Sequence, residues 1–344
     1  MAVRPEDDHF HDYKNFKGEW DRSRQWWNES GWFNFHIPER ELSGIFYVHH
    51  RPANGALYAG TALWDPYGDQ AENCLYYDWR LHLAPEKCDM FTFELPNSFK
   101  LELIQELKTF HFTYDNDGFK ADLFWEAFTP AQDQWERALP DEWMEWTTSG
   151  HFEQFGTVKG EIQIGSEKIE VDDLSARDHS WGPHKMENTG RGTFTWGIVD
   201  QQNGFFPYVV AKEPVPTDPI FDTVDVVKGG WYLKDGEIAT LVEGERTTLE
   251  RDDDGRPWKE LVVAKDSLGR EFRAEGEIKN HLFFQGFPDY WWWWCLTDWT
   301  VNGEQAWGET QDAAIQPHWR RVLYDRNREL GRRPSDLARA HAVG

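Results

Sequence analysis

The chain has 344 residues, with 36 Lys and Arg against 61 Asp and Glu, so its formal net charge at pH 7 is −25. Acidic side chains are spread along the whole sequence, which argues against nucleic acid or an anionic membrane as a partner, because both require a basic face. Aromatic residues make up 16% of the chain, including 21 Trp. This content is typical either of wide β-sheets or of a cavity for an apolar ligand.

The N-terminal 30 residues are polar with scattered aromatic side chains, and we expect them to form a strap over the rest of the fold. The opening stretch "MAVRPEDDHFHDYKNF" lacks the apolar core of a signal peptide, and the longest apolar run is too short to cross a bilayer. Cys74, Cys88 and Cys295 are odd in number and lack a metal-binding spacing. These features predict a cytoplasmic protein with reduced thiols and no membrane insertion.

Alternating apolar and polar residues predict many short β-strands. The pattern is clear in residues 119–128, 157–164 and 192–200. Six Asn-Gly or Asp-Gly pairs, Asp117-Gly118 and Asn203-Gly204 among them, are typical of two-residue hairpin loops. Dinucleotide-binding and P-loop glycine patterns are absent, so we expect no nucleotide cofactor. The sequence therefore predicts an all-β fold of antiparallel sheets.

Helix is expected in two places, a turn or two within 132–146 and a C-terminal helix over 316–330. Each half of the chain has enough strand candidates for a small barrel. The predicted organisation is an N-terminal strap, two consecutive β-barrels, and a C-terminal helix with its tail, at residues 1–30, 31–185, 186–315 and 316–344 respectively.

His151 and Glu153 lie two residues apart in "HFEQFG" and so point to one face of a predicted strand. They could bind a metal, but the sequence shows no clear third ligand. They could instead supply an acid/base pair facing Asp178, which is the interpretation we favour. An exposed pair without a role is the third possibility.

The stretch "SARDHSWGPH", residues 175–184, combines Arg, Asp, two His and a Trp near the middle of the chain. We interpret it as a polar turn in which Asp178 has Arg177, His179 and Trp181 as neighbours. A carboxyl group held neutral in an aromatic pocket can donate a proton to an alkene or to a leaving hydroxyl. Indole faces can then stabilise the resulting cation, so this chemistry needs no metal and no organic cofactor.

The alternative for this stretch is structural. Arg177 and Asp178 could form an ion pair that fixes a loop, with Gly182-Pro183 turning the chain. Ser180 is unsuited to a Ser-His-Asp triad, because the G-x-S-x-G elbow is missing.

Several aromatic residues are candidates for lining a ligand cavity. The run "YWWWWC" at 290–295 reads as a strand with alternate Trp side chains on opposite faces. For each single residue, core packing is the alternative role. The candidate substrate-binding residues are Trp79, Trp196, Tyr208, Trp292 and Trp294.

The segments "HFEQFGTVKGEI" and "DLSARDHSWGPH" resemble the lipocalin-like superfamily that contains carotenoid 1,2-hydratase. The D-x-x-W-G element of that group matches Asp178, Trp181 and Gly182. A bacterial branch carries the version R-D-x-S-W-G-P-R, from which this chain differs by having His184 at the last position. The resemblance implies two calycin-type barrels with a ligand cavity near their junction. It also implies that Asp178 is the proton donor, as in relatives that hydrate apolar polyenes; other relatives are fungal pericyclases.

The sequence thus predicts a protein of two lipocalin-like antiparallel barrels that acts as a cofactor-independent acid/base enzyme. Its substrate would be an apolar small molecule such as a terpenoid, a steroid or an aromatic lipid. The expected reaction is hydration, dehydration or double-bond isomerisation, with Asp178 as general acid, His179 and His151 as proton relays, and Trp181 and Trp196 as cavity walls. A cyclase or pericyclase and a non-catalytic carrier of a hydrophobic ligand remain alternatives.

Overall fold

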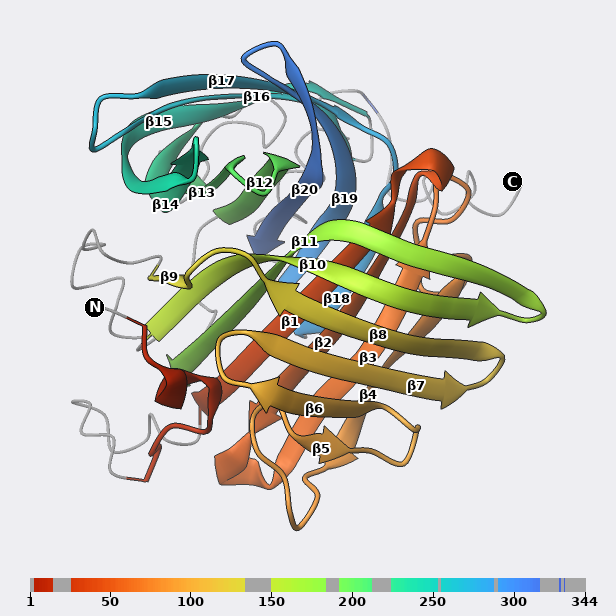
Figure 1. Cartoon of the computed structure of the whole chain (residues 1–344). Helices are drawn as coiled ribbons and strands as arrows, with labels where there is room; N and C mark the ends of the chain where they lie inside the picture. Colours follow the sequence, from red (N-terminus) through yellow and green to blue (C-terminus); the bar gives the residue numbers. More distant parts are fainter. Residues whose placement is uncertain are drawn as a thin grey trace.

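The computed structural model describes residues 3–14, 26–133, 150–183, 192–211, 224–252, 255–287 and 290–315, together with Arg328 and Gly331. Antiparallel strands dominate this part of the chain (Figure 1), which confirms the all-β prediction. Three short 3₁₀ helices accompany them, η1 (Pro5–Asp8), η3 (Pro38–Arg40) and η4 (Pro52–Asn54). Within the described residues, no helix has the length and apolar character needed to cross a membrane. The predicted helix 316–330 lies outside them, apart from Arg328.

The first sheet has eleven strands in the order β4-β3-β2-β1-β11-β10-β8-β7-β6-β5, with β9 paired to β10. It curls into a half-barrel that ends on β4 at one side and β5 at the other. Within 132–146, Gln132 and Asp133 form β9, and the remaining residues are outside the described part of the chain. The strands are β1 (Trp27–Ile37), β2 (Leu42–Arg51), β3 (Ala56–Trp64), β4 (Tyr76–Leu83), β5 (Phe93–Glu94), β6 (Lys100–Gln105), β7 (Thr109–Asn116), β8 (Phe119–Ala127), β9 (Gln132–Asp133), β10 (Gly150–Ile164) and β11 (Glu167–Pro183).

The second sheet has nine strands in the order β17-β16-β15-β14-β13-β12-β20-β19-β18. A further pairing of β17 with β19 closes eight of these strands into a barrel and leaves β18 attached outside it. Its strands are β12 (Gly192–Asp200), β13 (Asn203–Ala211), β14 (Val224–Lys234), β15 (Glu237–Arg251), β16 (Pro257–Asp266), β17 (Glu271–Ile278), β18 (Leu282–Phe287), β19 (Tyr290–Val301) and β20 (Glu304–Ile315).

Local sequence explains much of this strand pattern. Burial alternates residue by residue along β8, so that its apolar side chains enter the core and its polar side chains face water. The Asp117-Gly118 pair joins β7 to β8 with φ values of 47° and 82°, as a tight hairpin of this type requires. Asn203-Gly204, expected to be a hairpin loop, instead begins β13, and the turn lies just before it.

The prediction of a polar turn at 175–183 is wrong, because these residues form the end of strand β11. Strands β1 and β10 flank β11 in the sheet, and even Gly182 and Pro183 pair with β1. Polar side chains normally favour loops, but here buried partners on distant segments hydrogen-bond to them. His184 lies outside the described residues.

Three apolar cores occupy the two sheets and the space between them. The first fills the concave side of the half-barrel, and the third fills the closed barrel. The second contains residues of both sheets, among them Trp32, Phe155, Trp196 and Trp294, and so forms the junction between them. The two sheets contact each other where β11 lies against β12 and where β2 lies against β19 (Figure 1).

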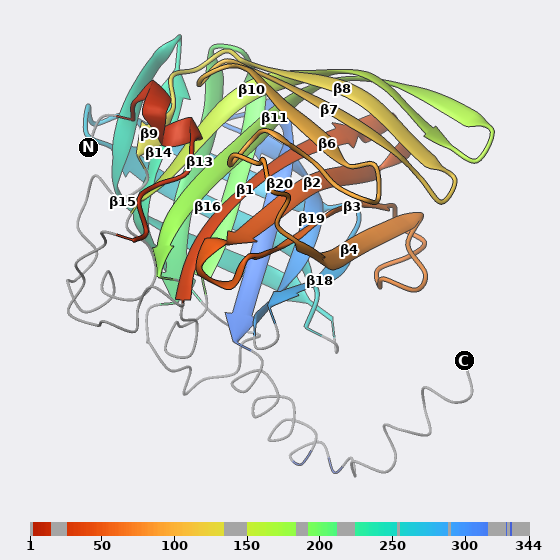
Figure 2. The ribbon, with the colours of Figure 1, turned by 90° about the horizontal axis from the view of Figure 1, so that it is seen from below.

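The N-terminal segment 3–14 lies at one end of the half-barrel. Its helix η1, drawn in red beside the N label in Figure 2, contacts the end of β11, where Asp7 bonds His179. Asp8 fixes this segment by accepting the backbone N–H of Leu107 and by pairing with the buried Arg177. The segment is therefore close to the strand that carries the sequence motif.

Candidate functional site

Strand β11 separates the motif into two polar groups on opposite faces of the half-barrel sheet. Arg177 lies against aromatic rings of the concave core, whereas Asp178 accepts a hydrogen bond from the backbone of Trp32 on β1. Because side chains alternate along a strand, His179 and Trp181 share the face of Arg177 and not that of Asp178. The expectation that Trp181 and His179 surround Asp178 is therefore wrong.

The structure brings Asp178 together with His151 and Glu153, here called the acid triad. His151 Nε2 lies 2.8 Å from Glu153 Oε1 and 3.5 Å from Asp178 Oδ2. Glu153 on β10 is directly opposite Asp178 on β11, and His151 is opposite Ser180. All three triad side chains are buried, and Glu153 Oε2 has no hydrogen-bond partner in the described structure.

The surroundings of the triad favour retention of protons. Burial raises the pKa of Glu153 to about 8, although the neighbouring His151 opposes this effect. Burial alone would lower the pKa of His151, but the carboxyl groups of Glu153 and Asp178 raise it to about 9. The raised pKa values favour retention of a proton by the His151–Glu153 pair, which can supply it to a group beside it.

This arrangement predicts a pH effect on stability that does not require a substrate. The pKa of Glu153 is higher in the folded chain than the 4.5 of an ordinary Glu, so the folded state binds this proton more tightly. Between pH 5 and 8 Glu153 therefore makes the free energy of unfolding fall as pH rises, by up to about 1 kcal/mol per pH unit. Glu153→Gln should reduce this slope most clearly between pH 5 and 6.5, where His151 is protonated in both the folded and the unfolded chain, as measured by urea unfolding at a series of pH values.

Glu161→Gln is the matched control for that prediction, because Glu161 lies on the same strand and forms an exposed ion pair with Lys168. The charged groups that act on Glu153 are His151, Asp178 and, through the sheet, Arg177. These groups stay in place in both variants. Equal slopes for wild type and Glu153→Gln would contradict the raised pKa.

Aromatic side chains from both sheets extend from the triad along the junction. The His151 ring lies 5.4 Å from Phe194 of β12, and Phe194 lies 5.1 Å from Tyr208 of β13, measured between ring centroids. On the other side, Trp32, which bonds Asp178 through its backbone, has its ring 6.0 Å from Trp294. The triad therefore borders an aromatic layer at the junction.

The five predicted substrate-binding residues belong to this layer at different places. Tyr208 is near the triad through Phe194, and Trp196 lies farther along β12 against Phe155. Trp79 stacks on Tyr47, which in turn lies 5.7 Å from Trp294. A hydrogen bond joins the Trp294 indole N–H to Glu309. Trp196, Trp292 and Trp294 are buried, while Trp79 and Tyr208 are half-buried.

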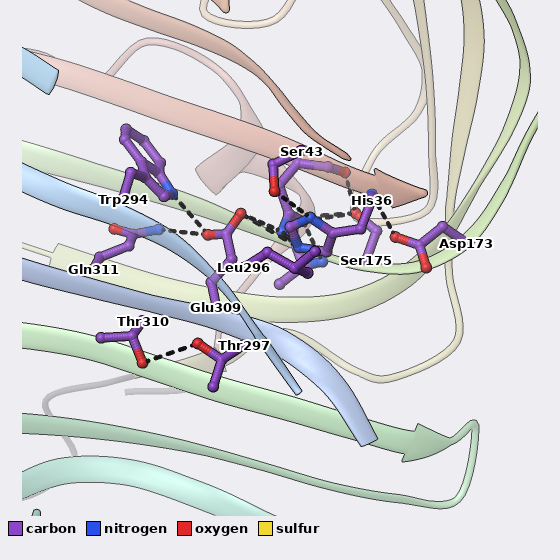
Figure 3. A network of polar contacts seen from close by, with 12 residues as sticks. His36, Ser43, Asp173, Ser175, Trp294, Leu296, Thr297, Glu309, Thr310 and Gln311 are labelled. Carbon is purple, nitrogen blue, oxygen red and sulfur yellow. Dashed lines mark hydrogen bonds and ion pairs between the residues drawn. The ribbon is translucent and has the colours of Figure 1, made fainter. Parts of the chain in front are cut away.

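A second buried carboxyl group, Glu309 of β20, lies in the junction (Figure 3). It accepts hydrogen bonds from Asn34, Trp294 and Gln311 at 2.7–3.0 Å, and His36 Nε2 is 3.5 Å away. Burial raises the pKa of Glu309 to about 7, and burial lowers the pKa of His36 to about 3. A neutral His36 therefore accepts from Asn34 through Nε2 and donates through Nδ1 to Ser43.

On the concave face, Arg177 is fully buried, and its one ion pair among the described residues is with Asp8 at 2.9 Å. Its Nε also donates to Gln154, and its guanidinium carbon lies 4.4 Å from the centroid of the Phe110 ring. Asp178 is on the other face of the sheet. Arg177 therefore stabilises the attachment of the N-terminal segment, in addition to any effect that it has on the triad.

Beside Arg177, His179 and Trp181 meet the N-terminal segment. The His179 Nδ1–H donates to the backbone oxygen of Asp7, and the Trp181 ring stacks on His11 at 3.8 Å. His11 and His179 both approach Glu29 of β1. Among the described residues, His11–Glu29–His179 and the acid triad are the two groups with suitable atoms and spacing to hold a metal ion.

Sequence reasoning missed several residues of these clusters, chiefly Asp8, Glu29, Trp32 and Glu309. Glu29 and Trp32 occur in "WNESGWFNF", whose alternation indicates a strand but not its position beside β11. Asp8 lies in "PEDDHF", which has the composition of an exposed turn. Only the pairing of distant segments gives these residues their roles.

Comparison with known proteins identifies one matching family model and a set of solved structures with a similar fold. The family model described as "Domain of unknown function (DUF7064)" matches residues 6–312. A comparison with the sequences of curated proteins gives no match. Sixteen solved chains have significantly similar structures.

One of these structures is a protein of Nitrosomonas europaea assigned as AttH, with 13% sequence identity and a TM-score of 0.58 over 92% of this chain and 97% of that one. Another is kievitone hydratase from Nectria haematococca, with 12% identity and a TM-score of 0.51 over 85% and 89%. A third is CghA, with 8% identity and a TM-score of 0.52 over 84% and 88%. At these identities the comparisons show a shared fold.

Proposed function

We propose that the chain, which belongs to the DUF7064 family, is an acid/base enzyme that hydrates an alkene or dehydrates the corresponding alcohol in an apolar small molecule. The observation that carries this proposal is the acid triad, in which the His151 Nε2 lies between two carboxyl groups beside an aromatic layer. Structural similarity to kievitone hydratase supports it at the level of the scaffold. The three cysteines are unpaired thiols, in keeping with a cytoplasmic location.

Asp178 is the group that transfers the proton to the substrate. Its Oδ1 is held by the Trp32 backbone N–H, which leaves Oδ2 to face His151. His151 passes its Nε2 proton to Oδ2 and regains a proton from Glu153 Oε1, 2.8 Å away. This sequence of transfers makes Glu153 a buried proton store for the acid.

The reaction balances with water as the only co-reactant. The π electrons of the alkene form a C–H bond with the Asp178 proton, and a carbocation remains on the neighbouring carbon. Water adds to this carbon, and the proton that it releases returns to the Asp178 carboxylate. Dehydration is the reverse, and loss of a neighbouring C–H proton in place of water addition gives a double-bond isomer.

The aromatic layer defines the substrate class. The Phe194 ring packs against His151 and the Tyr208 ring packs against Phe194, so the triad has aromatic π-faces near it that can stabilise a positive charge. An apolar terpenoid, a steroid or an aromatic lipid has the chemistry to lie on such a surface. The charged groups near the triad are engaged with one another, which disfavours a strongly charged substrate.

Oxygen labelling tests the proposal. Wild-type protein is incubated in H₂¹⁸O with a panel of apolar alkenes, including terpenoids, sterols and prenylated aromatics, and the products are analysed by mass spectrometry. Hydration puts one ¹⁸O into each product molecule. Product without ¹⁸O indicates isomerisation or cyclisation, and binding without any conversion indicates a carrier; either result contradicts the hydratase proposal.

A further inference from the structure

We propose that His11, Glu29 and His179 bind a divalent transition-metal ion, with Zn²⁺ as the best chemical fit, and that this ion fastens the N-terminal segment to the half-barrel. The three residues have one ligand atom each, and these atoms lie within 4.8 Å of one another. Two imidazoles and one carboxylate form a common ligand set for Zn²⁺. This site departs from the sequence-based expectation that the chain holds no metal.

The distances between the ligand atoms suit a small cation. Glu29 Oε2 lies 3.1 Å from His11 Nδ1 and 3.7 Å from His179 Nε2. Tetrahedral Zn²⁺ with bonds of about 2.1 Å places neighbouring ligand atoms roughly 3.4 Å apart. The observed values lie on either side of that separation, so a cation fits between the three atoms with small movements of side chains.

His179 provides an independent indication of a ligand. Its side chain is completely buried, and its Nδ1–H donates to the Asp7 backbone oxygen at 2.6 Å. Nε2 then directs a lone pair towards Glu29 Oε2, and it has no hydrogen-bond partner among the described residues. A lone pair that faces a buried carboxylate is unfavourable unless a cation lies between them.

The surrounding groups hold each ligand in the orientation that metal binding requires. Asp7 serves both imidazoles, since its backbone oxygen bonds His179 Nδ1 and its Oδ1 lies 3.5 Å from His11 Nε2. Glu29 Oε1 accepts the Trp27 indole N–H, and the His11 backbone N–H is shared between Oε1 at 2.9 Å and Oε2 at 3.2 Å, so the carboxylate is held with Oε2 facing the two imidazoles. Partners of this kind fix the tautomer and the orientation of ligands in metal sites.

The position of the site indicates a structural role for the metal. His11 comes from the N-terminal segment, Glu29 from β1 and His179 from β11, so one ion joins segments separated by about half of the chain. The Trp181 ring stacks on His11 and limits its movement. Asp178 is on the opposite face of β11, so the metal is not part of the proposed acid chemistry.

Metal binding by the purified full-length chain tests this inference. The protein is stripped with a chelator, dialysed against Zn²⁺ and analysed for bound metal, and Co²⁺ is used in parallel because its visible spectrum reports tetrahedral coordination. We expect about one equivalent in wild type. His11→Ala and Glu29→Gln should each weaken binding by roughly 100-fold or more. His11 is in a half-buried surface segment, so His11→Ala is expected to fold. This variant therefore still tests the site if the buried Glu29→Gln variant fails to fold.

Two further variants make the result specific. His9→Ala changes a histidine of the same segment that pairs with Asp89 outside the site, and we expect it to bind metal like wild type. His151→Ala removes a residue of the acid triad, the other group that could hold a metal, and it too should retain one equivalent. Failure of wild type to bind, or full binding by His11→Ala, would overturn the inference.

The same variants separate this inference from the proposed function. Loss of metal on His151→Ala alone would place the ion in the acid triad and contradict both proposals. Loss on His11→Ala alone supports the metal site whatever reaction the enzyme catalyses. Hydrogen–deuterium exchange gives a second measurement, because Zn²⁺ should slow exchange of the backbone amides in residues 3–14 of wild type but not of His11→Ala.

Discussion

Asp8→Ala is expected to lower the free energy of unfolding by about 3–5 kcal/mol, because it leaves the buried Arg177 guanidinium without its ion-pair partner. Both side chains are 0% exposed, and Asp8 is the carboxylate that contacts Arg177. In the described structure the other groups that contact the Arg177 side chain are Gln154 and aromatic rings, and the carboxyl groups of Glu153 and Asp178 act on it only through the sheet. A buried charge in such surroundings is much more costly than one at the surface. Urea unfolding at pH 7 measures the effect.

A second substitution separates the charge effect from lost packing. Adding Arg177→Met to Asp8→Ala removes the uncompensated charge while keeping an unbranched side chain, and it should recover a large part of the lost stability. Asp115→Ala is the control, because Asp115 forms an exposed ion pair with Lys120 and should change stability by less than about 1 kcal/mol. A loss no larger than that of the control would show that Asp8 is not needed to compensate Arg177.

Asp178→Asn is expected to lower kcat by about 10²–10⁴-fold on the substrate that wild type converts. Asn keeps the shape of the side chain and an oxygen that accepts the Trp32 N–H, but it has no carboxyl proton to transfer. Binding of the apolar substrate should change little, because the aromatic layer is intact. Steady-state kinetics and ligand titration by Trp fluorescence measure the two effects separately.

Asp172→Asn is the matched control for this prediction. Asp172 lies on the same strand and forms an exposed ion pair with Lys159. We expect wild-type turnover and wild-type stability for this variant. A kcat for Asp178→Asn within tenfold of wild type would show that another group supplies the proton, and the buried Glu309 would be the next candidate.

The sequence predicted the strands well because a half-buried strand leaves a direct period-two signal. Residues 119–128 and 157–164 are strands with the expected faces, and Asp117-Gly118 forms the expected hairpin. The placement of His151 and Glu153 on one face beside Asp178 also follows from that period together with strand pairing. The spacing of residues along the chain was therefore sufficient to predict a side chain's position where that position depends on one strand and its immediate neighbour.

Prediction failed where a role depends on which distant segments meet. The Asp178 region resembles a turn because its polar residues find their partners more than 140 positions earlier, at Trp32 and Asp8. The half-barrel does not pair β4 with β5, whereas β17 pairs with β19, and hydrophobic periodicity does not distinguish these outcomes. The position of Glu309 in the junction likewise depends on how the barrel packs against the half-barrel.

A proton from the buried acid triad is expected to reach a carbon atom of an apolar substrate. The most direct test is a single turnover in D₂O, with the product examined by NMR for deuterium bound to carbon. Wild type should place one deuterium per molecule on the carbon adjacent to the one that carries the new hydroxyl group, and Asp178→Asn should form no labelled product in the same time. Complete conversion by wild type without deuterium on carbon would contradict the account.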